Sequence, residues 1–122
     1  MKARRRVLVV DDDDTYREMI EAALGDEGYD VGSAPGGESG LELAARFKPH
    51  LILLDLRMAG KKDGHAFAKA YRRTPGRRAA IAVVTAARDP EGAAEAMGAH
   101  AFLAKPFDLG ELLNLVARHA GG

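Results

Sequence analysis

Three short segments that are apolar at every position constrain the fold of this chain more than any other sequence feature. They span residues 7–10, 51–54 and 79–84, and a polar residue directly follows each one. Apolar runs of this length, rich in Val, Ile and Leu, are typical of strands. Because their residues do not alternate between apolar and polar, both faces of each strand should be covered, as in a parallel sheet wrapped by helices. The three runs therefore favour an α/β fold.

Two weaker strands and five helical segments complete an alternating pattern. The weaker strands are predicted over residues 29–34 and 101–104. Segments with apolar residues at helical spacing, or rich in alanine, predict helices over residues 16–24, 41–47, 65–73, 90–97 and 109–116. Asp108 is placed to act as the N-cap of the last helix. Strand and helix thus alternate five times, which indicates a parallel α/β sandwich.

Length and composition indicate one ordinary domain. The chain has 122 residues, which suits a single domain over 1–122 but is too short for two. Its 18 basic and 18 acidic residues cancel, so no global field attracts nucleic acid or an anionic membrane. The absence of cysteine excludes disulfides, thiolate metal sites and cysteine nucleophiles.

The start of the chain is expected to carry no targeting or membrane segment. The basic start, Lys2 with the arginines at 4–6, runs into only four apolar residues, which is neither a signal peptide nor a membrane span. We therefore expect a cytoplasmic protein. Residues 119–122 are expected to form a frayed end, with no output domain in this chain.

Polar and charged residues follow four of the predicted strands, at the point where each strand ends. Asp11 and Asp12 follow the first strand, Asp55 the third, Thr85 the fourth and Lys105 the fifth. In an open parallel sheet, active groups collect at the carboxyl ends of the strands. We therefore expect three carboxylates, a hydroxyl and an ammonium to converge at one edge of the sheet.

Such a cluster suits phosphoryl chemistry assisted by Mg²⁺. Clustered carboxylates repel one another unless a cation joins them. Mg²⁺ prefers oxygen ligands and is typically held by one or two carboxylates together with phosphate oxygens. A carboxylate beside that ion can act as a nucleophile and form an aspartyl phosphate. Mg²⁺, Lys105 and the Thr85 hydroxyl would then share the charge of the transferred group.

Four motifs occur in an order that resembles the receiver domains of two-component response regulators. They are VLVVDDD at 7–13, LILLDLRM at 51–58, VVTA at 83–86 and FLAKPF at 102–107. The resemblance runs over essentially the whole chain. It implies a doubly wound, flavodoxin-like fold, in which a five-stranded parallel sheet of order 2-1-3-4-5 is flanked by five helices.

The resemblance also implies a role for the charged residues of the cluster. Asp55 would be the phosphoacceptor. Asp11 and Asp12 would bind Mg²⁺ together with Asp55 and the backbone carbonyl of Arg57. Lys105 would pair with the phosphate.

Switching in this family passes through two further positions. Thr85 would move to hydrogen-bond the phosphate and draw Phe102 inward, which would change the surface for partner binding. The bond before Pro106 is expected to be cis. Implied partners are a sensor histidine kinase or phosphotransfer protein as phosphodonor, and a downstream output protein or an output domain missing from this chain. A homodimer paired through the fourth and fifth helices is a further alternative.

The chain departs from the family pattern after the third strand. Ala59 stands where the family usually has proline, and the pair Asp63-Gly64 comes one residue later than usual. We therefore expect a longer and looser loop. Because Arg57 precedes the change, the metal site should survive it.

Two alternative functions compete with a phosphorylated switch. A Mg²⁺-dependent phosphohydrolase would need a second acid near the nucleophile, commonly two residues after it, and this chain has Arg57 there. We therefore expect no enzymatic turnover. The altered loop suggests a degenerate receiver that binds partners without phosphate, but the presence of all the expected polar residues argues against it.

Other conspicuous residues have simpler interpretations. Pro35-Gly36-Gly37 and Gly40 match neither of the phosphate-binding glycine motifs and are interpreted as a turn. The histidines at 50, 65, 100 and 119 lack metal-ligand spacing and are expected to be surface or packing residues. The arginines at 4–6 and at 72, 73, 77 and 78 lack interleaved aromatics in a neutral chain, so direct nucleic-acid binding is not expected.

Overall fold

Five parallel strands form one sheet in the described part of the chain. The computed structural model describes residues 4–58, 63–76 and 78–121. The strands are β1 (Arg6–Val10), β2 (Asp30–Ala34), β3 (Leu51–Leu54), β4 (Ala80–Thr85) and β5 (Ala101–Ala104). Their order across the sheet is β2-β1-β3-β4-β5, and every neighbouring pair is parallel. The predicted fold class and strand order are therefore confirmed.

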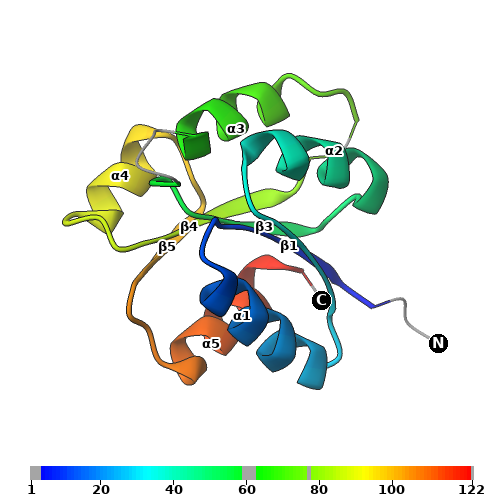
Figure 1. Ribbon diagram of the computed structural model, residues 1–122, viewed down its shortest axis with the longest axis vertical. Coiled ribbons are helices and arrows are strands. Elements are labelled where there is room, and N and C mark those ends of the chain that lie inside the picture. The colour runs from blue at the N-terminus through cyan, green and yellow to red at the C-terminus, as the bar shows by residue number, and fades with distance from the viewer. Residues whose placement is uncertain (1–3, 59–62, 77, 122) are drawn as a thin grey trace.

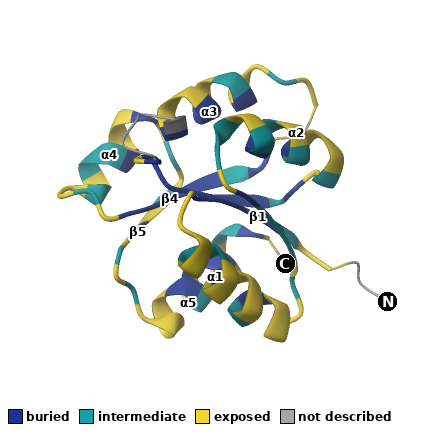
Figure 2. Cartoon of the chain, in the orientation of Figure 1, coloured by how far each residue is buried: buried dark blue, intermediate teal, exposed yellow. Residues whose placement is uncertain are grey.

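Helices cover both faces of this sheet. Within the described residues they are α1 (Asp14–Asp26), α2 (Gly37–Phe47), α3 (Asp63–Arg72), α4 (Pro90–Ala96) and α5 (Leu109–His119). Figure 1 shows α1 and α5 on one face and α2, α3 and α4 on the other. The central strands β1, β3 and β4 are mostly buried, whereas the outer faces of the helices are exposed (Figure 2). None of these helices is both long and apolar enough to traverse a bilayer.

The sheet separates two apolar cores. In β1, Val7 and Val9 point into the core beneath α1 and α5, whereas Leu8 and Val10 point into the core beneath α2, α3 and α4. This alternation follows from the period of two residues along a strand. Each Leu or Val side chain that is fully buried in this way stabilises the fold by roughly 1.5–3 kcal/mol. The two cores explain why the central strands are apolar at every position.

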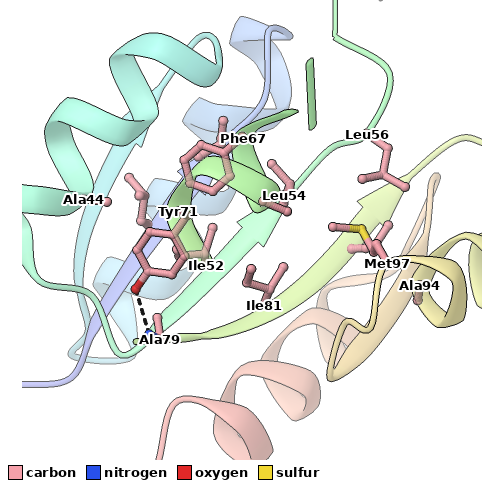
Figure 3. Close-up of a cluster of buried hydrophobic side chains, with 14 of the residues drawn as sticks. Ala44, Ile52, Leu54, Leu56, Phe67, Tyr71, Ala79, Ile81, Ala94 and Met97 are labelled. Atoms are coloured by element: carbon pink, nitrogen blue, oxygen red, sulfur yellow. Dashed lines mark hydrogen bonds between the residues drawn. The ribbon is translucent and has the colours of Figure 1, made fainter. Parts of the chain in front are cut away.

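A stacked aromatic pair anchors α3 on the sheet. The rings of Phe67 and Tyr71 lie parallel, with centroids 5.8 Å apart. The Tyr71 hydroxyl accepts a hydrogen bond from the backbone N–H of Ala79 at 2.7 Å (Figure 3). Ala79 directly precedes β4, so this contact ties the end of α3 to the start of the next strand.

Aspartate side chains cap the N-termini of the two helices that follow β1 and β5. Asp13 caps α1 by accepting a hydrogen bond from the N–H of Thr15 at 2.9 Å. Asp108 caps α5 and forms a capping box with Glu111, which confirms its predicted role. A cap of this kind stabilises a helix by about 1 kcal/mol. Asp13 lies three residues after the end of β1 and Asp108 four residues after the end of β5, so the caps help to hold the loops that carry them.

Two local predictions are wrong. Gly37 and Gly40, predicted to lie in a turn, belong to α2. A Cβ at Gly40 would come within 3.1 Å of both Phe67 and Val10, so glycine lets α2 pack closely on the sheet. His119 is the last residue of α5 and Ala120 is buried in the core, so this end of the helix is held by packing and is not frayed.

Candidate functional site

Three carboxylates meet where β1 and β3 end. Val10 pairs with Leu54 in the register of these adjacent strands, so the next residues, Asp11 and Asp55, lie side by side. Ligand oxygens of Asp11, Asp12 and Asp55 all lie within 4.8 Å of one another. Asp11 is 2% exposed and Asp55 is 7% exposed, whereas Asp12 lies at the surface. The structure thus brings the three predicted carboxylates together.

The ammonium of Lys105 reaches this cluster from the end of β5. Its Nζ lies 2.6 Å from Asp11 Oδ2 and 3.1 Å from Asp55 Oδ2, and the lysine side chain is 7% exposed. The predicted cis bond between Lys105 and Pro106 is present. One ammonium therefore pairs with both buried carboxylates and offsets part of their mutual repulsion.

Burial and ion pairing act against each other in this cluster. Burial has the largest influence on Asp11 and raises the pKa of its carboxyl above the ordinary 3.8, although Lys105 and the Asp13 N–H act in the opposite direction. Burial alone would lower the pKa of Lys105, but hydrogen bonds and charges from Asp11 and Asp55 outweigh it and raise that pKa above 10.5. Lys105 therefore stays a cation at neutral pH, and Asp11 holds its negative charge less firmly than an exposed carboxyl does.

Backbone amides orient the two buried carboxylates in the same way. Asp11 Oδ1 accepts a hydrogen bond from the N–H of Asp13 at 2.9 Å. Asp55 Oδ1 accepts one from the N–H of Arg57 at 3.1 Å. In each case the donor lies two residues further along the chain, and the other oxygen, Oδ2, is bonded to Lys105. Each carboxylate is therefore held by its own loop on one side and by the shared ammonium on the other.

Thr85 lies beside Lys105, whereas Phe102 points to the surface. The backbone N–H of Lys105 donates to the Thr85 carbonyl at 2.9 Å. Thr85 is fully buried, and its hydroxyl oxygen accepts a hydrogen bond from the Ala87 N–H at 3.3 Å. Phe102 pairs with Val83 across β4 and β5 and is 42% exposed. The structure therefore places Thr85 next to the cluster and Phe102 outside it.

Two residues without a predicted role support the cluster. Arg17 donates a hydrogen bond from Nη1 to the Asp11 carbonyl at 2.6 Å and pairs with Asp14. A Cβ on Gly64 would lie 2.5 Å from the Asp55 carbonyl oxygen, so glycine is needed where α3 begins against the end of β3. The acidic run before Arg17 is the sequence signal that comes nearest to the first contact. The predicted longer loop, which carries Ala59, falls on residues 59–62 and lies outside the described residues.

The donor set suits a divalent cation that prefers oxygen ligands. Within the described ranges, Asp11, Asp12 and Asp55 form a group that offers three carboxylate ligand atoms. Hard cations such as Mg²⁺ bind carboxylate oxygens in preference to nitrogen or sulfur. Clustered carboxylates repel one another, so a bound cation would offset part of that repulsion. The cluster can therefore hold a metal ion.

Comparison with known proteins assigns the chain to a family. The response regulator receiver domain family matches residues 7–117. The chain belongs to this family. This receiver is 37% identical over 126 residues to the regulatory protein AtoC of Escherichia coli (strain K12), a match that covers 98% of the receiver and 26% of AtoC.

A second relative gives the same assignment. The transcriptional regulatory protein PdtaR of Mycobacterium tuberculosis (strain ATCC 25618 / H37Rv) is 38% identical over 112 residues, which cover 89% of this receiver and 53% of PdtaR. The receiver thus spans between about a quarter and about half of the length of these curated relatives. The predicted family is confirmed, and the chain is a signalling domain of two-component systems.

Solved structures of related proteins share the fold. A putative response regulator from Chloroflexus aurantiacus J-10-fl has a TM-score of 0.85 at 32% identity, with 97% of this receiver and 98% of that chain covered. The BeF3-activated N-terminal receiver domain of RstA from Klebsiella pneumoniae has a TM-score of 0.81 at 29% identity, with 97% and 100% covered. The similarity therefore extends over the whole of each of these receivers.

Proposed function

We propose that this receiver is a Mg²⁺-dependent switch that accepts a phosphoryl group on Asp55. The position of Asp55 carries the proposal, because this buried carboxylate shares one ammonium with Asp11 and lies within 4.8 Å of two other carboxylates. The ion would be held by Asp11, Asp12, Asp55 and the backbone carbonyl of Arg57. When bound, it supplies positive charge that neutralises the oxygens of the incoming phosphoryl group.

The chain's own residues would orient and neutralise the reacting groups. The Asp55 carboxylate attacks the phosphorus of the donor, an Asp55 O–P bond forms, and the leaving group departs with the electron pair of the broken bond. The Arg57 N–H holds the attacking carboxylate through Oδ1. Lys105 already contacts Asp55 Oδ2, so its ammonium is close to where the phosphoryl oxygens would lie.

The switch would pass from the phosphate through Thr85 to Phe102. In this structure the Thr85 hydroxyl is bonded to the Ala87 N–H, and Phe102 is exposed, as expected for the outward state. Phosphate on Asp55 would draw the Thr85 hydroxyl toward it, and the ring of Phe102 would then pack inward. Because Phe102 carries no hydroxyl, the two states differ by packing alone, and phosphate biases an equilibrium between them. The BeF3-activated form of the RstA receiver supports an activated state of this fold.

The proposed setting is a phosphorelay in the cytoplasm. A sensor histidine kinase or a phosphotransfer protein would supply the phosphoryl group, and an output protein or output domain would recognise the surface around Phe102. The printed names of AtoC and PdtaR, a regulatory and a transcriptional regulatory protein, support a regulatory output. We further propose that residues 1–122 form one receiver domain, with no direct contact to nucleic acid or membrane, and that a homodimer through α4 and α5 is one way to present this surface.

An enzymatic role is not part of the proposal. Phosphohydrolases that pass through an aspartyl phosphate need a second acid near the nucleophile to activate water. Two residues after Asp55 this receiver has Arg57, whose exposed side chain carries the opposite charge. The receiver would therefore hold the phosphoryl group as a signal and lose it by hydrolysis.

Intact mass spectrometry tests the proposal directly. The protein is incubated with acetyl phosphate with and without Mg²⁺, together with Asp55→Asn and with Asp26→Asn as a control at an exposed aspartate. We expect one phosphate adduct that requires Mg²⁺, is absent in Asp55→Asn and is kept in Asp26→Asn. An adduct of equal yield in Asp55→Asn would place the phosphoryl group elsewhere, and no adduct in any sample would contradict the switch.

A further inference from the structure

The ring of Tyr16 lies against the ammonium that pairs with the acidic cluster. Lys105 Nζ is 4.2 Å from the centroid of this ring. A cation within about 6 Å of the ring centroid is attracted to the electron-rich face of an aromatic ring. Because the Lys105 side chain is 7% exposed, its ammonium has lost most of its water and the attraction is weakly screened. Tyr16, predicted only as part of the apolar face of the first helix, therefore contacts the proposed site.

One contact holds the backbone of Tyr16 and another holds its ring. The Tyr16 backbone N–H donates to Asp13 Oδ1 at 3.3 Å in the cap of α1. The ring also packs on Phe107, with centroids 5.7 Å apart and planes inclined by 46°. Phe107 lies two residues after Lys105 in the same loop, so Tyr16 connects α1 with the segment that carries the ammonium. The Tyr16 ring therefore packs between Phe107 and the Lys105 ammonium at the side of the site.

We infer that Tyr16 is a positioning residue that holds the Lys105 ammonium over the acidic cluster. The inference rests on the proposed function of Asp55. On phosphorylation, Lys105 would exchange its hydrogen bond to Asp55 Oδ2 for one to a phosphoryl oxygen. A lysine side chain is flexible and could swing out during this exchange. The attraction of the ring does not depend on which oxygen the ammonium contacts, so it keeps Lys105 within reach throughout.

The test separates the charge distribution of the ring from its shape. Phenylalanine and its fluorinated analogues at position 16 keep a ring of nearly the same size, while added fluorine withdraws electron density from its face. We expect the rate of Asp55 phosphorylation by acetyl phosphate to be kept in Tyr16→Phe and to fall stepwise along the fluorinated series. In Tyr16→Leu it should fall by about twofold to thirtyfold, the range of a cation–π contact. A purely structural role would give equal rates for the fluorinated and unfluorinated rings.

A second measurement does not need phosphorylation. The ring current of Tyr16 should shift the NMR signals of the Lys105 ε-methylene protons upfield, and we expect this shift to be kept in Tyr16→Phe and lost in Tyr16→Leu. Tyr29→Leu is the matched control, because Tyr29 is half-buried against the core and precedes β2 at the opposite edge of the sheet. It should change neither the rate nor the shift.

The outcomes distinguish this inference from the proposed function. If the wild-type protein accepts phosphate and the rate is the same across the whole Tyr16 series, the inference is overturned and the proposed function stands. If the wild-type protein accepts none, the proposed function is overturned. An ε-methylene shift that is unchanged in Tyr16→Leu would in that case overturn the inference as well.

Discussion

The two edges of the sheet use side chains in opposite ways. Where the strands begin, the His50 N–H donates to the Arg6 carbonyl at 2.8 Å, and the Arg6 N–H donates to His50 Nδ1 at 3.0 Å. His100 and Ile81 repeat this exchange at 2.8 Å and 3.1 Å. Where the strands end, charged carboxylates instead gather around the ammonium of Lys105.

We infer that the contacts at the amino edge contribute to stability, whereas the charged residues at the carboxyl edge serve the proposed function. Each of these two histidines accepts a backbone N–H near the start of a neighbouring strand: His50 from Arg6, the first residue of β1, and His100 from Ile81, the second residue of β4. The amino edge is therefore joined by backbone N–H groups that donate to imidazole nitrogens. At the carboxyl edge two buried carboxylates, Asp11 and Asp55, share the ammonium of Lys105, and clustered carboxylates of this kind favour the binding of a cation. His50 and His100, predicted as surface or packing residues, thus have a more specific role than expected.

The largest change in phosphorylation rate is expected when the Lys105 ammonium is removed from the carboxyl edge. Lys105→Met keeps much of the side-chain length but removes the charge beside Asp55 Oδ2. We expect the rate of phosphorylation by acetyl phosphate and Mg²⁺ to fall about 100-fold, as for the loss of one donor aimed at developing charge. Intact mass followed over time measures the rate, with Lys69→Met on the exposed side of α3 as control. A rate within twofold of wild type would remove Lys105 from the mechanism.

A substitution at Gly64 should disturb the carboxyl edge through packing. Gly64→Ala places a Cβ 2.5 Å from the Asp55 carbonyl oxygen, and overpacking of this kind lowers the free energy of unfolding by about 1–3 kcal/mol. The loss should appear in urea unfolding together with slower phosphorylation. Gly25→Ala in α1 is the control, because nothing lies within 4 Å of its Cβ and the change should be neutral or slightly stabilising. Equal results for the two variants would contradict the close approach of α3.

Substitutions at the amino edge should affect stability without affecting function. His50→Ala and His100→Ala each remove the acceptor of one backbone N–H and should lower the free energy of unfolding by about 1 kcal/mol. The phosphorylation rate should stay unchanged. His65→Ala, at an exposed position of α3, should leave both quantities unaltered. Slower phosphorylation in His50→Ala or His100→Ala would show that the amino edge also contributes to function.

The smallest effect is expected from alkaline pH. The pKa of Lys105 is raised above 10.5 in the folded protein, so the folded state binds this proton more tightly than the unfolded chain does. Its contribution is complete below the unfolded pKa and is lost as pH rises through the folded pKa. Urea unfolding without divalent cations should therefore show a decline in stability above about pH 10.5 that is weaker in Lys105→Met. The same decline in both proteins would show that other groups cause it.

Most of the fold and the membership of the site could be predicted, because both follow from patterns along the chain. The apolar runs predicted β1, β3 and β4. The polar residues that directly follow these runs, Asp11, Asp55 and Thr85, were predicted to lie at the site. The partners of each side chain could not be predicted in this way. The exchange between His50 and Arg6 joins residues 44 positions apart, and Lys105 meets Asp11 across 94 positions.

Contacts of this kind depend on the register of neighbouring strands and on how a helix packs, and neither has a local sequence signal. Tyr16 has the spacing of an ordinary core residue, and only the fold brings its ring to Lys105. The prediction that Gly40 lies in a turn is wrong for the same reason. Glycine is needed there because α2 approaches the sheet closely, and not because the chain turns at this position.

The division of the apolar interior by the sheet has a consequence for how such sequences diverge. Among the described residues, the buried side chains beneath α1 and α5 form one cluster, and those beneath α2, α3 and α4 form another. Substitutions that lie far apart and share no partner usually have additive effects. One side can therefore accumulate compensating changes while the other keeps its old packing, and a lineage can rebuild one half of the molecule without rebuilding the other.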